Sequence, residues 1–528
     1  MLEKHKRVCK DTSIKGGTVV GISFAKKLKR FYPRLVLVGA TLVLSVASMV
    51  PSGLVKDASA LTPGNGAPTP VYRWWHGSDK DWVSIPAHGR QKSDAAMVTA
   101  GYTKNTTPQY YVSMIGTTDT NMVAVYRWWN STDKDWVDFR EGSPSDATLA
   151  SWGYSDKKFQ YYAYSNSATG RVAVNRWWNN SDKDWITLRQ DEISDSTLTS
   201  WGYTNKTLIA YAYSSQSPSG EMGYFSMGTP QSSVVPTSFA SGQYPHTMSV
   251  VDVNPSLDQN VNDGYRYLGY FGHNYCGGIY IARSNDLSAS AWQEDSSGPT
   301  FTGTTPCRWA SALVDGSQVD LVVSQVWNST ITAQTSTDGL DGTTFGTPTV
   351  LVSENDVANG NPTLFKDPTD GKFYLYWYRH VTNSGLWEIR VKSSTTFSGL
   401  IGSGSSDLGQ IVASSHELIA APQVMYYGGK YYLGVETQEG DQVADDGNCI
   451  GGVPSAQCVW KTRMLTSTSA TGPFYEIPAN PIYGAGSACV FQHVVGNTLH
   501  SYYCKQNDLT SNSSWTLDHV TADLTSPN

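Results

Sequence analysis

Short apolar runs that alternate with polar residues dominate the chain beyond about residue 240, where amphipathic helical periodicity is almost absent. Five such runs recur at intervals of about 50 to 70 residues, and turn pairs such as Asp-Gly and Gly-Gly often lead from a run into a second strand. This spacing predicts antiparallel hairpins, because strand side chains point alternately to the two faces of a sheet. The runs are His246–Val253, Arg308–Asp315, Gly360–Asp367, Ala420–Tyr427 and Gly486–His493.

Regularly spaced hairpins are typical of a β-propeller, whose blades are small antiparallel sheets around a central channel. We therefore expect an all-β fold with a five-bladed propeller over residues 241–528. The first strand of each blade would line the channel. Polar side chains at or beside the five runs thus become candidates for a functional site.

A second pattern repeats three times before the propeller. The segments VYRWWHGSDKDWV, VYRWWNSTDKDWV and VNRWWNNSDKDWI begin at Val71, Val125 and Val174, and each continues to a Ser-Asp pair and then to Gly-Tyr. Units of about 50 residues are too small to bury cores of their own, so the copies should close around a pseudo-threefold axis. This predicts a β-trefoil-like module over residues 70–220, followed by a Ser/Pro/Gly-rich linker at 221–240.

Each copy contains two adjacent tryptophans within an expected strand. Neighbouring strand residues point to opposite faces, so one indole of each pair can pack inward while the other stays near the surface. An exposed indole is a flat platform for the apolar face of a sugar ring. The alternative is that every tryptophan of the repeat builds the module core. The candidate glycan contacts are Trp75, Trp129 and Trp178.

An Asp-Lys-Asp segment follows each tryptophan pair, at 79–81, 133–135 and 182–184. Small turn-forming residues precede it, so we expect the aspartates to cap a turn. Binding of calcium or of a sugar hydroxyl is the alternative. No cofactor is expected beyond such a structural calcium.

The first 60 residues differ in composition from the rest of the chain. They contain eleven Lys and Arg against three acids, then an apolar stretch at 35–50 and the small residues at 58–60. This order predicts a long secretory signal over residues 1–60, followed by a linker at 61–69. An uncleaved anchor is the alternative, although 16 apolar residues are slightly short for a membrane span.

Beyond residue 60 the chain is acidic, with 27 basic and 42 acidic residues and a net charge of about −15. A nucleic-acid partner is therefore not expected, because phosphate binding needs a basic surface. The aromatic content of 12% against only 16% charged residues disfavours disorder and suits β-structure.

Six cysteines follow the predicted signal, and an even number in a secreted chain predicts disulfides. Six cysteines allow fifteen pairings. Proximity favours Cys449 with Cys458 and Cys489 with Cys504, which leaves Cys276 for Cys307. A zinc site is the alternative, but no CxxC spacing or His cluster supports it.

The segment NPTLFKDPTDGKFYLYWYR, from Asn361, resembles the first two strands of a blade in the five-bladed β-propeller glycoside hydrolases. This arabinanase- and xylosidase-like group acts on arabinans, xylans, fructans and related glycans, and the bacterial endo-D-arabinanase group is a specific candidate within it. The resemblance covers residues 240–528. The threefold repeat resembles the VYRFYN-type repeats appended to secreted bacterial cell-wall and polysaccharide-active proteins, which implies binding rather than catalysis.

Hydrolysis of a glycosidic bond needs two carboxyl groups, one protonated to assist the leaving group and one ionised as base or nucleophile. The resemblance implies that Asp252, in the first run, is the basic carboxylate; the alternative is that it begins a turn. It also implies that Glu417, ahead of the fourth run, is the proton donor, although the family's usual Glu-Gly-Pro is absent there. Glu354 and Asp356, before the third run, compete for that role or would adjust the donor's pKa.

Asp263 and Glu436, near strand ends, are further competitors for the proton donor. Other polar or aromatic side chains border the same inner strands and are candidates for substrate binding, with a structural role as the alternative for each. These residues are His246, Asn274, Arg308, Trp309, Asn361 and His380.

Together these features predict a secreted glycoside hydrolase that cleaves a pentose or furanose polysaccharide of the arabinan type, with cell-wall D-arabinan as a specific case. We expect a monomer, free of the membrane after signal cleavage, whose module binds cell-wall glycan. The alternatives are a non-catalytic lectin-like protein and a polysaccharide lyase, which would use a Lys, Arg or Tyr site. No Ser/His/Asp elbow, P-loop or HExxH motif supports a protease or a nucleotide-dependent enzyme.

Overall fold

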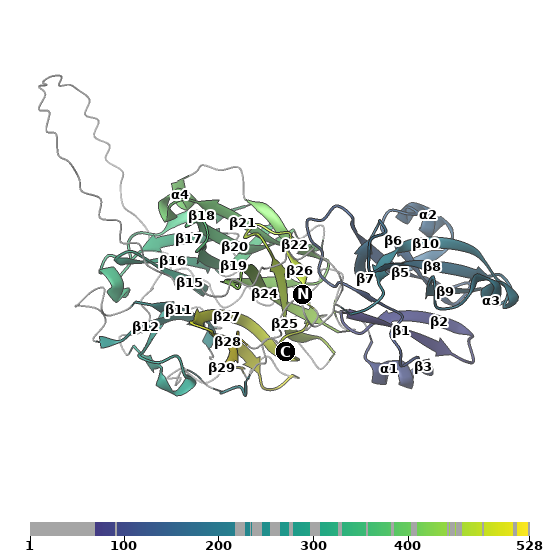
Figure 1. Ribbon diagram of the computed structural model, residues 1–528, viewed down its shortest axis with the longest axis horizontal. Helices are drawn as coiled ribbons and strands as arrows, with labels where there is room; N and C mark the ends of the chain where they lie inside the picture. The colour runs from purple at the N-terminus through teal and green to yellow at the C-terminus, as the bar shows by residue number, and fades with distance from the viewer. Residues whose placement is uncertain are drawn as a thin grey trace, which may run out of the picture. The chain divides into compact units, whose positions relative to one another are not determined.

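The computed structural model describes most of residues 69–525 (Figure 1). The predicted signal at 1–60 lies outside the described residues, as do the side chains of His246, Cys307 and Arg308. The internal gaps are 90–91, 217–227, 233, 235–244, 254–263, 274–277, 296–306, 326–329, 355–356, 382–384, 403–408, 441–442, 444–448, 450–456, 478–479 and 510–514.

Five antiparallel sheets follow one another along the C-terminal part of the chain. The first contains β11 (Pro245–Asp252), β12 (Tyr267–His273), β13 (Tyr280–Ser284) and β14 (Gln293–Glu294). The second contains β15 (Cys307–Asp315), β16 (Gln318–Gln325), β17 (Thr330–Thr335) and β18 (Thr349–Ser353). The third contains β19 (Val357–Lys366), β20 (Phe373–Val381), β21 (Leu386–Ser394) and β22 (Gln410–Ser415). The fourth contains β23 (Ile419–Tyr427), β24 (Lys430–Glu439), β25 (Val459–Ser467) and β26 (Tyr475–Glu476), and the fifth contains β27 (Ser487–Val495), β28 (Thr498–Gln506) and β29 (Trp515–Asp523).

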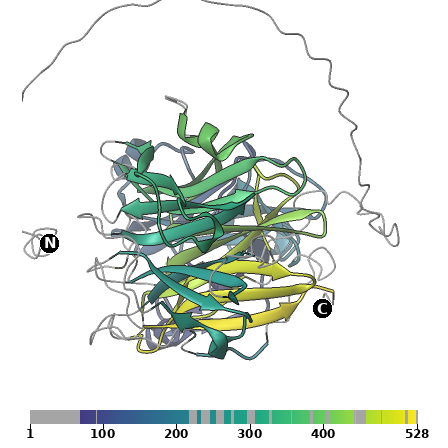
Figure 2. The same ribbon diagram turned by 90° about the vertical axis from the view of Figure 1, so that its left-hand side faces the viewer.

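The first strands of the five sheets meet around a common centre. Strands β11, β15, β19, β23 and β27 contact one another in this order, and β27 also contacts β11, which closes the ring. Figure 2 shows the first sheet, in teal, beside the last, in yellow. The structure therefore confirms the predicted five-bladed propeller.

The fifth blade gains an outer segment from the other end of the domain. The backbone N–H groups of Gly228 and Gln231 donate to the carbonyl oxygens of Thr521 and His519 on β29, both over 2.8 Å. These residues lie within the segment that the sequence assigned to a linker. The propeller is thus closed by hydrogen bonds between its two ends.

Second strands of the blades are buried on both faces, because each blade packs between two others. In β20 the consecutive residues Leu375, Tyr376 and Trp377 are all fully buried. A strand in this position reads as a continuous apolar run rather than an alternating one. Between the third and fourth strands of the first three blades lie the 3₁₀ turns Ala289–Ala291 and Gly339–Asp341 and the short helix α4 (Phe397–Gly402).

The three repeats fold as three similar units, each with a hairpin, a short helix and a returning strand. The first contains β1 (Thr69–His76), β2 (Asp81–Pro86), α1 (Asp94–Thr99), β3 (Tyr102–Lys104) and β4 (Tyr110–Val112). The second contains β5 (Met122–Asn130), β6 (Asp135–Arg140), α2 (Asp146–Ser151) and β7 (Tyr154–Tyr164). The third contains β8 (Arg171–Asn179), β9 (Asp184–Arg189), α3 (Asp195–Ser200) and β10 (Tyr203–Tyr213).

The repeats are arranged around a pseudo-threefold axis. Strands β2, β6 and β9, which are equivalent in the three copies, contact one another. In each copy the returning strand pairs with the first strand of the hairpin. The expected threefold closure is present, and each copy adds a short helix that the sequence pattern did not predict. The β-trefoil assignment itself stays a prediction.

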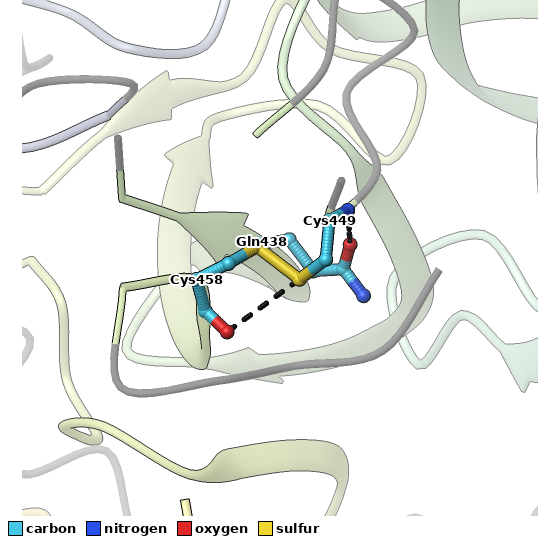
Figure 3. The surroundings of a disulfide bond; sticks show 3 residues. All are labelled: Gln438, Cys449 and Cys458. Atoms are coloured by element: carbon cyan, nitrogen blue, oxygen red, sulfur yellow. Dashed lines mark hydrogen bonds between the residues drawn. A yellow bond between two sulfur atoms is a disulfide. The ribbon is translucent and has the colours of Figure 1, made fainter. Parts of the chain in front are cut away.

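Two of the predicted disulfides are confirmed. Cys449 bonds Cys458, and Cys489 bonds Cys504. The backbone N–H of Cys449 also donates to Gln438 Oε1 over 2.7 Å, which attaches the disulfide to β24 (Figure 3). Cys276 lies outside the described residues. Among the helices of the described part of the chain, none is long and apolar enough to cross a membrane.

Candidate active site

The five inner strands share an irregularity of hydrogen-bond register near their first residues. Residues there lack a direct cross-strand partner, as in a β-bulge, and bulges redirect side chains at functional sites. Asn361, Ala421 and Cys489 adopt positive φ at these points, of 48°, 46° and 48°. The blades therefore present comparable positions to the channel.

Side chains from all five inner strands close around a narrow space on the channel axis. Its volume is about 10 Å³, which is room for about one water molecule. A space of this size is too small for a sugar ring. Among the described residues, this lining contains no carboxylate. It consists of Thr247, Trp309, Ala310, Asn361, Pro362, Thr363, Ala421, Pro422, Gln423, Val490 and Phe491.

The predicted binding residues divide into three groups. Trp309 and Asn361 line the channel. His380 instead stacks on Trp387 of the neighbouring strand, with ring centroids 4.1 Å apart and an interplanar angle of 9°, inside blade three. Asn274 and the side chains of His246 and Arg308 lie outside the described residues.

Asp252 lies at the opposite end of its strand from the channel lining. It is the last residue of β11, whereas Thr247 is the third, a separation of about 16 Å along the strand. Arg266 holds its carboxylate through Nη2 at 2.7 Å and Nε at 3.1 Å. The structure thus places Asp252 in a partly exposed ion pair with Arg266.

Glu417 lies in the crossover between blades three and four and is buried. Its backbone N–H donates to Ser415 Oγ over 2.9 Å. The preceding residue, His416, bonds Tyr126 Oη over 2.8 Å and stacks on Tyr162, both in the repeat module. The segment with Glu417 therefore belongs to the contact between module and propeller.

Glu354 belongs to an ion-pair network of blade three. Arg379 Nε lies 2.9 Å from Glu354, and Arg379 Nη1 lies 3.2 Å from Glu388. Glu354 is therefore already engaged in an ion pair inside blade three. Asp356 lies outside the described residues.

Glu436 is a buried carboxylate that contacts the bulged parts of two inner strands. On β24 it lies opposite Ala420, just before the bulge of the fourth inner strand. Its Oε2 accepts a hydrogen bond of 3.0 Å from the backbone N–H of Cys489, at the bulge of the fifth. Burial raises the pKa of Glu436 to about 7, despite this hydrogen bond. Its carboxyl group can therefore carry a proton near neutral pH.

The tryptophans of the repeat module alternate as expected for strands. Trp74, Trp128 and Trp177, the first of each pair, are buried. The second of each pair is half-buried and packs on the tryptophan of the adjoining strand, with ring centroids 4.5 to 5.1 Å apart. These packed pairs are Trp75 with Trp82, Trp129 with Trp136, and Trp178 with Trp185.

Two other tryptophans are far more exposed than the predicted ones. Trp152 and Trp201, directly after α2 and α3, have exposed fractions of 55% and 54%. The sequence analysis missed them. Their signal is the Trp-Gly-Tyr triplet in the second and third copies, which is Ala-Gly-Tyr from Ala100 in the first.

No known protein family and no curated protein matches the chain. Among solved structures, the chain is similar to a thermostable family-43 glycoside hydrolase, at 14% identity and a TM-score of 0.39, over 54% of this chain and 91% of that one. A GH43_1 enzyme from Xanthomonas citri matches at 13% identity and 0.35, over 57% and 91%. An exo-1,5-alpha-L-arabinanase from a bovine ruminal metagenomic library matches at 11% and 0.37, over 53% and 94%. Such distant matches carry no argument about function, which has to come from the chain's own residues.

Proposed function

We propose that the protein is a secreted glycoside hydrolase whose propeller cleaves a pentose or furanose polymer of the arabinan type, with Glu436 as the proton donor. The observation that carries this proposal is the environment of Glu436. It is a buried carboxyl group with a pKa raised to about 7, located where the fourth and fifth inner strands bulge. A general acid needs such a pKa to remain protonated until the glycosidic oxygen leaves.

The assignment to Glu436 departs from Glu417, the proton donor that the family resemblance implies, but it concerns the same inner strand. The resemblance predicts a Glu shortly before a Pro-containing inner strand, and this chain has Ala420 and Ala421 before Pro422. Glu436 lies directly opposite Ala420 on the adjacent strand. In this proposal the carboxyl group of Glu436, on β24, takes the place of the Glu that the family has before its inner strand.

Hydrolysis needs a second carboxylate, and we assign Asp356 to this role. Asp356 precedes β19, the inner strand whose Asn361 lines the channel. In this proposal it acts as base or nucleophile. Glu354, two residues earlier, is already paired with Arg379.

The repeat module would hold the polymer or the cell wall. Trp152 and Trp201 offer exposed indole faces, and the half-buried Trp75, Trp129 and Trp178 offer smaller ones. Sugar rings pack well on such faces because their hydroxyls can stay hydrated at the edges. A β-trefoil-like module with three such units would bind an extended glycan at more than one point.

A non-catalytic, lectin-like function is the second candidate. It is favoured by the described channel lining, which lacks a carboxylate, and by the ion pair that Asp252 makes with Arg266. Both candidates predict glycan binding. They differ in whether new reducing ends appear.

The test is incubation of the secreted protein with arabinans, xylans and mycobacterial-type arabinogalactan, with reducing ends measured over time. We expect release from an arabinan by wild type and by Asp252→Asn, and loss of release in Glu436→Gln and Asp356→Asn. Release that persists in Glu436→Gln would overturn the assignment of the proton donor. Binding without release from any of these glycans would establish the lectin-like function instead.

A further inference from the structure

The second aspartate of each Asp-Lys-Asp segment begins β2, β6 or β9, the strands that meet on the pseudo-threefold axis of the repeat module. One carboxylate oxygen from each of Asp81, Asp135 and Asp184 lies within 4.8 Å of the other two. Their exposed fractions are 5%, 3% and 3%. The first aspartates differ, since the side chain of Asp79 is 68% exposed. Three carboxylates are therefore buried together in the centre of the module.

Backbone groups of neighbouring copies hold these carboxylates. The Trp82 N–H of the first copy donates to Asp184 Oδ1 of the third over 3.4 Å. The Trp185 N–H of the third copy donates to Asp135 Oδ2 of the second over 3.1 Å. The carboxylates thus lie where the copies meet, and hydrogen bonds from a neighbouring copy hold two of them in position.

Tyrosine hydroxyls donate hydrogen bonds to two of the three carboxylates. Tyr102 donates to Asp81 Oδ2, and Tyr203 donates to Asp184 Oδ2. In the second copy, the equivalent Tyr154 hydroxyl instead accepts from Trp185 Nε1 over 2.9 Å. The tyrosines therefore leave oxygen atoms on the axis available.

Two buried carboxylate oxygens on the axis have no hydrogen-bond partner among the described residues: Asp81 Oδ1 and Asp135 Oδ1. An unpaired charged oxygen in the interior is strongly unfavourable, and three carboxylates side by side also repel one another. Arg127 and His76 both act electrostatically on Asp81, but Arg127 Nε is already paired with Asp138 over 3.1 Å, and His76 Nδ1 lies 3.0 Å from Asp79. The positive charge that this cluster requires is therefore not supplied by Arg127.

We propose that the pseudo-threefold axis binds a calcium ion, to which Asp81, Asp135 and Asp184 each contribute one carboxylate oxygen. Three points no more than 4.8 Å apart fit on a circle with a radius of at most about 2.8 Å. This upper limit admits the calcium–oxygen distance of about 2.3 to 2.6 Å. An all-oxygen donor set also favours a hard cation over zinc or copper.

Such an ion would join the three repeats. Each copy supplies one ligand, so the full site exists only when all three copies are folded and docked. Binding would then stabilise the closed module by mass action, in proportion to the calcium concentration. This inference concerns the module alone and holds whether or not the propeller is a hydrolase.

Protonation is the competing way to neutralise the cluster. Burial and the charges of the two neighbouring aspartates raise the pKa of Asp135 well above its ordinary range, and burial raises that of Asp184 to about 7. Without a cation, these groups would take up protons. Because calcium ligands must be ionised carboxylates, the binding test is made at pH 8.

The experiment uses the full secreted chain, freed of metal with EDTA and dialysed. We expect 1 mM Ca²⁺ to raise the melting temperature by at least about 3 °C at pH 8, and Tb³⁺ to give luminescence sensitised by the nearby tryptophans. Asp135→Asn should abolish both effects. Asp133→Asn is the matched control in the same turn, because its amide oxygen can still accept the bond of Asn130 Nδ2, and it should retain both effects.

A second measurement gives an answer even if the Asp135→Asn variant does not fold. Metal analysis of wild type prepared in Ca²⁺ should find one equivalent of tightly held calcium beyond that in Asp135→Asn. If Asp135→Asn has a lower melting temperature than wild type in EDTA, the variant is destabilised without calcium. The Tb³⁺ titration and the metal content of wild type then decide whether calcium binds. An unchanged wild-type melting temperature with no retained calcium, or a calcium response that persists in folded Asp135→Asn, would overturn the proposal.

Discussion

Glu436 and Glu439 lie three residues apart on β24, yet their surroundings move their pKa values in opposite directions. Both are buried, which alone would raise the pKa of each carboxyl group. Glu436 accepts a hydrogen bond from the backbone N–H of Cys489, and burial raises its pKa to about 7. Glu439 lies against Arg463 and Lys461, which hold its pKa well below the usual range. Only Glu436 can therefore donate a proton near neutral pH.

The pH profile of hydrolysis tests this role for Glu436. A general acid must be protonated, so kcat/KM for an arabinan should fall as the pH rises through about 7. Glu436→Gln should lower kcat/KM by about 10² to 10⁴-fold and remove this limb of the profile from the residual activity. A descending limb that stays in Glu436→Gln would assign the proton to another group.

Glu439 has a structural role that can be tested separately. Arg463 is fully buried and pairs with Glu439 at 2.7 Å and with Glu476 at 2.6 Å, while Glu476 also accepts from the Met114 N–H of the module. Glu439→Gln leaves excess buried positive charge and should lower the free energy of unfolding by about 3 to 5 kcal/mol. Urea unfolding measures this change.

The matched control is the exposed pair of Lys366 and Asp315, whose charged atoms are 2.7 Å apart. Asp315→Asn should cost less than about 1 kcal/mol, because water and salt screen a surface pair. Equal costs for the two variants would contradict the role assigned to the buried network.

At the scale of single strands and turns, most of the propeller could be predicted from sequence. Hairpins depend on local features, such as the Asp-Gly and Gly-Gly turns and the apolar runs beside them, and each predicted run lies on an inner strand. The segment that contains Gly228 and Gln231 was missed as part of blade five. Its partner, β29, lies almost 300 residues later, and no local pattern specifies such a pairing.

The module helices were missed for a different reason. They have six residues each, too few to show helical periodicity. Their signal is the Ser-Asp pair, since Ser93, Ser145 and Ser194 are the N-caps and each accepts a backbone N–H three residues later. The sequence analysis used this pair as a marker of the repeat without assigning its structure.

Removal of one cap tests how much these short helices contribute. Ser145→Ala removes the acceptor for the Thr148 N–H, 3.2 Å away, and should destabilise the module by about 1 kcal/mol. Ser151→Ala, in the last turn of the same helix, removes an exposed hydroxyl that donates to the Thr148 carbonyl and caps no free N–H, so it should change stability by less than about 0.5 kcal/mol. Urea unfolding followed by tryptophan fluorescence compares the two, and similar costs would contradict a capping role.

At the scale of the whole molecule, symmetry could be predicted and the site could not. Regular spacing along the chain revealed both the fivefold ring and the threefold module. A catalytic or binding site depends on which side chains lie close together in space. Their positions depend on strand register and packing, which the spacing of repeats does not specify. The sequence analysis singled out Asp252 because it is a charged residue among valines. In the structure its carboxylate pairs with Arg266. The sequence analysis expected Asp135 to cap a turn. In the structure its carboxylate lies beside those of Asp81 and Asp184.

The carboxylates on the module axis should make stability depend on pH when calcium is removed. Burial raises the pKa of Asp184 from 3.8 to about 7, so the folded protein binds protons more tightly than the unfolded chain. The resulting stabilisation is complete below about pH 4 and is lost as the pH rises through 7, by up to about 4 kcal/mol for one such site. In EDTA, the free energy of unfolding should therefore fall between pH 5 and pH 8. Asp184→Asn should flatten this slope, leaving the part due to Glu436 and the other two aspartates, and 1 mM Ca²⁺ should flatten it in wild type. A slope unchanged by either would mean that these carboxylates are already neutralised by another group.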